Sequence, residues 1–92
     1  MATRATRKTA VRSVYRTEQQ VVIEVLRSLR ESAGLTQVGL AEALGRTQSY
    51  VSAAERGSKL DTLQIRDWCH ACGTDLVTWA RAIETALSGK RR

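Results

Sequence analysis

Residues that can cap a helix alternate along this chain with glycines that can end one, and proline is absent throughout. Each of five segments opens on threonine or aspartate, continues with apolar residues three and four positions apart, and closes on glycine. Threonine and aspartate side chains accept hydrogen bonds from the free amides of a first helical turn, and glycine readily adopts the left-handed conformation that ends a helix. The alternation therefore predicts an all-α fold of five helices.

The expected helices cover about residues 18–33, 37–44, 48–56, 62–72 and 75–88, where the apolar spacing is that of an amphipathic helix. Two apolar residues of the first segment, Val21 and Ile23, fall outside its apolar stripe. They are candidates for contact with a second subunit or with the residues that precede the helix. A chain of 92 residues suffices for one hydrophobic core, so we expect a single domain.

The whole chain has a net charge of +6, and the positive charge is concentrated at its two ends. Residues 18–89 hold seven cations against nine acids. We therefore divide the chain into a flexible basic N-terminal arm (1–16), a folded domain (17–89) and a basic C-terminal tail (90–92). The basic residues of the arm are Arg4, Arg7, Lys8, Arg12 and Arg16. Such ends suit a polyanion, most simply nucleic acid, although a solvated tail would have the same composition.

The second and third segments have the spacing of a helix-turn-helix, in which two short helices are joined by a tight glycine turn. Gly45 would supply the turn, Ala41 is small where the helices cross, and Val51 would fill the space beneath the second helix. Each of the two helices begins with a Thr-Gln step, at Thr36-Gln37 and Thr47-Gln48. A generic helical hairpin can share the spacing, so the spacing alone does not distinguish the two motifs.

The stretch from Leu26 to Gly73 resembles the phage repressor and Cro type of helix-turn-helix domain, the XRE family. The matching landmarks are Ala33-Gly34-Leu35-Thr36-Gln37, Leu40-Ala41, Leu44-Gly45, Gln48-Ser49-Tyr50-Val51-Ser52 and Glu55-Arg56-Gly57. The resemblance covers about residues 20–75. It implies a lambda-repressor-like five-helix domain whose Gln48–Arg56 helix enters the major groove of double-stranded DNA.

The resemblance also implies roles for individual residues. Gln48 would read adenine, because its amide offers a donor and an acceptor that match adenine N7 and N6, and Gln37 would bond a phosphate and brace Gln48. The candidate base contacts are Thr47, Gln48, Ser49, Ser52 and Ala53. The candidate phosphate contacts are Thr36, Gln37, Tyr50, Arg56 and Lys59, of which Tyr50 is equally suited to packing. The arm would bind further phosphates or enter the minor groove.

Two positions depart from the family pattern. Gly39 lies inside the first helix of the pair, where it costs about 1 kcal/mol relative to alanine. Ala53 offers a methyl group where many relatives have a polar side chain, so it can touch a thymine methyl but cannot form a hydrogen bond. Sequence discrimination should therefore depend mainly on Gln48, Ser49 and Ser52.

The pair Cys69 and Cys72 has the spacing of a metal or redox motif, but both residues fall on the apolar stripe of the fourth helix. A structural zinc site needs four ligands, whereas the chain has two cysteines and one histidine. We expect small buried thiols, no metal, no cofactor and no enzymatic activity. No apolar run has the length of a membrane span or the form of a secretory signal, and free cysteines fit a reducing compartment, so we expect a cytoplasmic protein.

One reading helix spans few base pairs, so proteins of this type usually pair, and we expect a homodimer. Trp79, Ile83 and Leu87 of the last helix are candidates for the dimer interface, or for capping the core of the monomer. The sequence thus predicts a sequence-specific transcriptional regulator, most simply a repressor that occupies its operator. The alternatives are an antitoxin that pairs with a toxin and represses its own operon, a restriction-controller-type activator, and a helical protein-interaction domain that does not bind DNA.

Overall fold

The computed structural model describes residues 18–91, and over this range the chain forms five helices and no strands. A first helix over residues 18–32 is followed by α2 (Gln37–Leu44), α3 (Gln48–Ala54), α4 (Thr62–Ala71) and α5 (Leu76–Arg91). The all-α prediction is therefore confirmed. The N-terminal arm with its five basic residues, and the cap expected at Thr17, lie outside the described range.

Helices α2, α3 and α4 begin at the residues that the capping pattern predicts. The Thr36 hydroxyl accepts a hydrogen bond from the Gly39 amide at 3.0 Å, and the Thr47 hydroxyl accepts one from the Tyr50 amide at 3.2 Å. A reciprocal capping box opens α4. The Gln64 amide donates to the Asp61 carboxylate at 2.8 Å, and the Asp61 amide donates to the Gln64 side chain at 2.9 Å.

Two helix ends differ from the prediction by two residues or more. Helix α3 ends at Ala54 rather than Arg56, because the amides of Arg56 and Ser58 both turn back to the Ala53 carbonyl, at 3.0 and 2.9 Å. Helix α5 continues through Gly89 to Arg91 instead of stopping before that glycine. Gly89 is not among the glycines with positive φ, so it leaves the helical backbone uninterrupted.

A hydrophobic cluster joins the first four helices. Its members are Leu26, Leu40, Ala41, Val51, Ala54 and Trp68. Trp68 is fully buried, and its indole nitrogen donates to the Leu26 carbonyl at 3.1 Å, which ties α4 to the first helix. Ile23, expected outside the apolar stripe, is buried and lies beside Gly57, and Val21 is only 1% exposed. Neither side chain is left on the surface for a second subunit.

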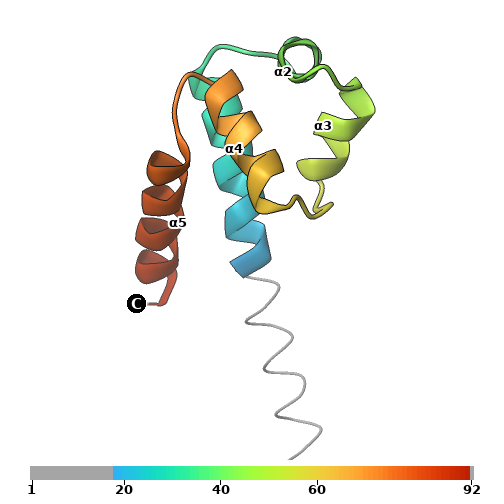
Figure 1. Cartoon of the computed structure of the whole chain (residues 1–92). Coiled ribbons are helices and arrows are strands. Elements are labelled where there is room, and N and C mark those ends of the chain that lie inside the picture. The colour runs from blue at the N-terminus through green and yellow to red at the C-terminus, as the bar shows by residue number, and fades with distance from the viewer. Residues whose placement is uncertain (1–17, 92) are drawn as a thin grey trace, which may run out of the picture.

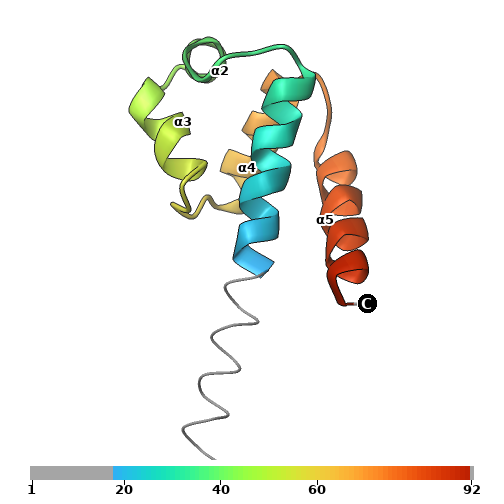
Figure 2. The same cartoon turned by 180° about the vertical axis from the view of Figure 1, so that it is seen from behind.

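The first helix and α4 lie side by side at the centre of the molecule (Figure 1). Helices α2 and α3 lie on one side of this pair, and α5 lies on the other side, an arrangement also visible from behind (Figure 2). The outer surface of α3 is therefore not covered by α5.

Candidate nucleic-acid interface

The two glutamines that open α2 and α3 are in direct contact. The Gln48 side-chain nitrogen donates to the Gln37 side-chain oxygen at 3.1 Å. Both residues occupy the first position of their helices, each directly after a capping threonine, so the turn at Gly45 brings the two helix starts together. Gly45 has φ +67°, a left-handed conformation that few other residues adopt without strain. Gln48 is exposed and Gln37 is half-buried.

Gln37 is in turn held by Glu55, the residue that follows α3. The Gln37 side-chain nitrogen donates to Glu55 Oε1 at 3.0 Å. Glu55 is a buried acid, with its side chain only 1% exposed. Arg30 of the first helix donates to both of its carboxylate oxygens, at 2.6 and 3.1 Å, and also to the Leu35 carbonyl at 2.8 Å. A continuous set of hydrogen bonds thus runs from the interior to the exposed start of α3.

Charge and hydrogen bonding keep the Glu55 carboxylate ionised. Burial acts to raise its pKa, but hydrogen bonds from Arg30 and Gln37, with the charges of Arg30 and Arg27, outweigh burial and lower it. The Arg27 guanidinium lies 3.6 Å from Glu55 Oε1, and the Arg27 side chain is half-exposed. Glu55 therefore acts only as a hydrogen-bond acceptor at neutral pH.

The remaining predicted base contacts lie along the same helix. Ser49 is exposed, and Ser52 and Ala53 are half-buried. The Ser52 hydroxyl accepts a hydrogen bond from Arg56 at 3.0 Å, so this guanidinium extends back along α3. The Thr47 hydroxyl is engaged in its cap. Thr47, Gln48 and Ser49 are the exposed members of this set, and of these only Thr47 has its hydroxyl engaged in a helix cap.

The predicted phosphate contacts surround this helix. Thr36, Arg56 and Lys59 are exposed. Tyr50 packs against the hydrophobic cluster, and burial raises the pKa of its hydroxyl. The Arg46 guanidinium lies 4.7 Å from the centre of the Tyr50 ring, within cation–π range. Tyr50 therefore packs against the core, which was one of the two roles predicted for it. Its ring also supports Arg46, for which the sequence predicted no role.

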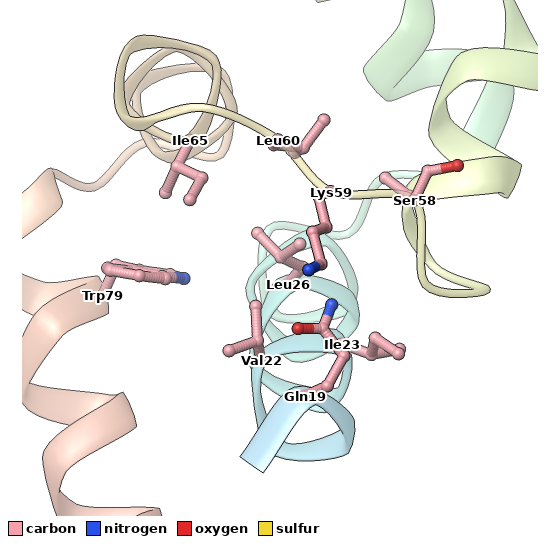
Figure 3. A pocket seen from close by; sticks show the side chains of 10 residues that line it. Gln19, Val22, Ile23, Leu26, Ser58, Lys59, Leu60, Ile65 and Trp79 are labelled. Carbon is pink, nitrogen blue, oxygen red and sulfur yellow. The ribbon is translucent and has the colours of Figure 1, made fainter. Parts of the chain in front are cut away.

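The three candidates for a dimer interface have different surroundings. Trp79 packs against the hydrophobic cluster, whereas Ile83 and Leu87 are half-buried along α5. The Trp79 ring also lines a cavity of about 240 Å³ between the first helix, the α3–α4 connection, α4 and α5 (Figure 3). Trp79 thus contributes to the core of the monomer, although the residue as a whole is only partly buried.

Cys69 lies on the inner side of α4, and Cys72 is the residue that caps the end of this helix. Both are free thiols, Cys69 buried and Cys72 partly buried. Burial raises the pKa of Cys69 to about 11, and it raises that of Cys72 as well. Within residues 18–91, no group of three or more potential metal ligands comes together. The helices of that range include none long and apolar enough to cross a membrane.

Sequence reasoning missed three residues of this site, Arg30, Arg46 and Glu55. A signal existed for Glu55, because it continues the buried spacing set by Val51 and Ala54, and an acid on such a stripe requires a partner. The partner, Arg30, lies 25 positions earlier and has no comparable signal. Arg46 could be linked to Tyr50 by their four-residue separation across the start of α3.

Comparison with known proteins also indicates a helix-turn-helix protein. A family described as a helix-turn-helix domain matches residues 24–82, which is more than half of the chain. The structure of an XRE-family like protein from Pseudomonas syringae pv. tomato str. DC3000 is similar, with a TM-score of 0.74 and 33% sequence identity. This match covers 84% of the present chain and 95% of that protein.

Two structures of the clp gene regulator ClgR from Corynebacterium glutamicum are also similar. One has a TM-score of 0.71 and 25% identity, covering 80% of each chain. The other has a TM-score of 0.68 and 27% identity, covering 76% of this chain and 91% of that one. None of the curated protein sequences compared with the chain matches it. The helix-turn-helix match and the extensive XRE-type similarity show that the chain belongs to the XRE family of helix-turn-helix DNA-binding regulators.

Proposed function

We propose that this protein is a transcriptional repressor that reads operator DNA with the amino-terminal residues of α3. The observation that carries the proposal is the exposed Gln48 amide, held at the start of α3 by Gln37. A helix-turn-helix presents the beginning of its second helix to base edges in the major groove. The similarity to ClgR, whose name describes a gene regulator, supports a regulatory role.

Base reading is assigned first to Gln48. Its nitrogen has two hydrogens, and one of them is used by Gln37. The other hydrogen and the side-chain oxygen remain for adenine N7 and N6. Ser49 lies next to Gln48 and is exposed, so it supplies the second contact. Thr47, Ser52 and Ala53 complete the base-facing set, with the Ala53 methyl group suited to thymine.

Phosphate binding is assigned to the residues around α3. Thr36 and Gln37 lie at the start of α2, and Arg56 and Lys59 follow the reading helix. We add Arg46, because stacking on Tyr50 restrains its guanidinium before DNA is bound. The Tyr50 hydroxyl is retained as a phosphate contact at the edge of this pair. The arm residues would add further phosphate contacts.

We also propose that the protein acts as a homodimer and represses by occupying its operator in the cytoplasm. Helices α3 and α5 lie on opposite sides of the central helix pair (Figures 1 and 2). A two-fold contact through α5 would therefore place the reading helices toward the outer ends of the dimer, as two half-sites require. Ile83 and Leu87, with the edge of Trp79, form the proposed interface.

The proposal is tested by selecting bound sequences from a random duplex pool and measuring affinity for the selected site. Paired half-sites about one DNA turn apart are expected for a homodimer. Replacing Gln48 by alanine should remove the preference at one base pair of each half-site, at a cost of about 1–3 kcal/mol. Gln20→Ala, which removes an exposed glutamine from the first helix, is the matched control. Unchanged preference in Gln48→Ala would refute the assignment.

Salt dependence tests the phosphate contacts separately. Arg56→Gln should reduce the slope of log affinity against log salt by about 1.8 for the homodimer, because each of the two subunits loses one phosphate contact that contributes about 0.9. Arg81→Gln, which removes an exposed arginine from α5, should leave the slope unchanged. Equal slopes for the two variants would remove Arg56 from the interface.

A further inference from the structure

Four side chains connect the interior of the protein to the proposed reading surface. Arg30 donates to Glu55 at 2.6 Å, Gln37 donates to Glu55 at 3.0 Å, and Gln48 donates to Gln37 at 3.1 Å. We call this series the Glu55 relay. Every donor in the relay points toward Glu55, so the direction of each hydrogen bond depends on what that carboxylate can accept.

A buried carboxylate imposes one orientation on its neighbour. Glu55 is 1% exposed and is bonded by Arg30 through both oxygens. An ionised carboxylate has no hydrogen to donate, so the Gln37 amide must turn its nitrogen toward Glu55. The Gln37 oxygen then faces Gln48, as observed.

The same reasoning extends to the exposed glutamine. The Gln37 oxygen can only accept, so Gln48 must turn its nitrogen toward it. One of the two hydrogens on the Gln48 nitrogen is thereby occupied, and one hydrogen and the oxygen remain for a ligand. Rotating the Gln48 amide by half a turn would place two acceptor oxygens against each other and lose a hydrogen bond.

We propose that Glu55 is a positioning residue that fixes the order of donor and acceptor on Gln48 and thereby makes the protein prefer adenine to guanine. This inference rests on the proposed function of Gln48 as the base-reading residue. Adenine presents an acceptor at N7 and a donor at N6, whereas guanine presents acceptors at N7 and O6. With its order fixed, Gln48 matches adenine and opposes its own oxygen to guanine O6.

Loss of the hydrogen bond to Gln37 changes which bases the Gln48 amide can bind. A Gln48 side chain that is not bonded to Gln37 has both hydrogens of its nitrogen available. It can then turn this nitrogen toward guanine and donate to O6 and N7. Loss of the relay should therefore relax discrimination at one base pair rather than abolish DNA binding.

Two substitutions break the relay at different places. Glu55→Gln places an amide beside Gln37 that can donate or accept, so the Gln37 amide has two allowed orientations. Gln37→Met removes the connection between Glu55 and Gln48 and leaves the Arg30–Glu55 pair in place. The affinity ratio between the selected site and the same site with guanine for adenine should fall about five- to tenfold in both variants, the effect of one hydrogen bond.

The substituted base pair is the one at which Gln48→Ala loses its preference, so this variant also separates the two hypotheses. If Gln48→Ala loses the adenine preference but Glu55→Gln and Gln37→Met keep it, the relay has no role in specificity and the proposed function stands. If Gln48→Ala itself keeps the preference, the proposed function and the relay inference both fail. A general loss of folding would lower affinity for all duplexes and would leave the ratio between them unchanged among folded molecules.

Nuclear magnetic resonance of the protein without DNA tests the relay independently of base reading. In the wild type, one side-chain hydrogen of Gln48 should exchange with water several-fold more slowly than the other, because it is bonded to Gln37. The difference should disappear in Gln37→Met, which serves as the test if Glu55→Gln does not fold. Equal exchange of the two hydrogens in the wild type would overturn the inference.

Discussion

Removing Arg30 should destabilise this protein more than removing Arg27, the other arginine that lies close to Glu55. Arg30 donates to both carboxylate oxygens, at 2.6 and 3.1 Å, and its side chain is 12% exposed. Arg30→Met keeps much of the apolar length of the side chain and removes the charge. Glu55, at 1% exposure, is then left without its main partner.

The expected loss is large for a domain of this size. Breaking a buried ion pair by removing one partner costs about 3–5 kcal/mol, because an uncompensated charge stays buried. Gln37 and Arg27 still contact the Glu55 carboxylate in this variant, at 3.0 and 3.6 Å, so the loss should lie near the lower end of that range. A domain is stable by roughly 0.05–0.15 kcal/mol per residue, so about 3 kcal/mol is a substantial part of the total.

Arg30→Met should also reverse the way in which ionisation of Glu55 makes folding stability depend on pH. In the wild type, the pKa of Glu55 is lowered in the folded state, so its contribution to stability is present above the unfolded pKa and is lost as pH falls through the folded value. Without Arg30, burial should raise the folded pKa of Glu55 above the unfolded value. The destabilisation of Arg30→Met should then be greatest at neutral pH and should shrink as acid protonates Glu55.

Urea unfolding followed by circular dichroism, between pH 7 and pH 4, measures both effects. Arg27→Met is the matched control, because the Arg27 side chain is 52% exposed and lies 3.6 Å from the same carboxylate. A pair that exposed is typically worth no more than about 1 kcal/mol. If Arg30→Met costs no more than Arg27→Met at neutral pH, the argument that Glu55 needs a buried partner is wrong.

Two further predictions concern α2 and α4. Gly39→Ala should stabilise the protein by about 0.5 kcal/mol, since the helical gain of about 1 kcal/mol is offset by a new Cβ atom 3.3 Å from the Thr36 hydroxyl. A lower midpoint of thermal unfolding would show instead that the Thr36 cap is broken. In a Cys72→Ser background, Cys69 should react with iodoacetamide at pH 8 far more slowly in the folded protein than in urea, because its pKa is about 11. Equal rates would mean that Cys69 is not buried.

Local chemistry explains how much of the fold could be predicted. Helix starts are set by a side chain and an amide three residues apart, so Thr36, Thr47 and Asp61 were readable from the sequence. Helix ends were less certain. Gly89 sits where a stop was expected, but a glycine without positive φ continues a helix, and only the backbone distinguishes the two cases.

In the candidate site, too, some contacts could be predicted from the sequence and others could not. Contact between Gln37 and Gln48 was expected from the family resemblance, and the structure places the two amides 3.1 Å apart. The anchor of that pair was not expected, because Arg30 and Glu55 are 25 positions apart and meet only through packing of the first helix against the end of α3. The shortened end of α3 was not expected either, because it depends on the amides of Arg56 and Ser58 turning back to the Ala53 carbonyl.

The ion pair between Arg30 and Glu55 is not needed for stability alone. Apolar residues of similar volume often replace a buried ion pair without loss, because the charges no longer have to be desolvated. An apolar residue at Glu55 could not accept from Gln37, however, and the Gln37 amide would lose the bond that sets its orientation. The double variant Arg30→Met and Glu55→Met should therefore remain more stable than Arg30→Met while losing adenine preference as Gln37→Met does. That result would show that Glu55 is needed for specificity but not for stability. A double variant that kept the adenine preference would show instead that the charge of Glu55 serves only the core.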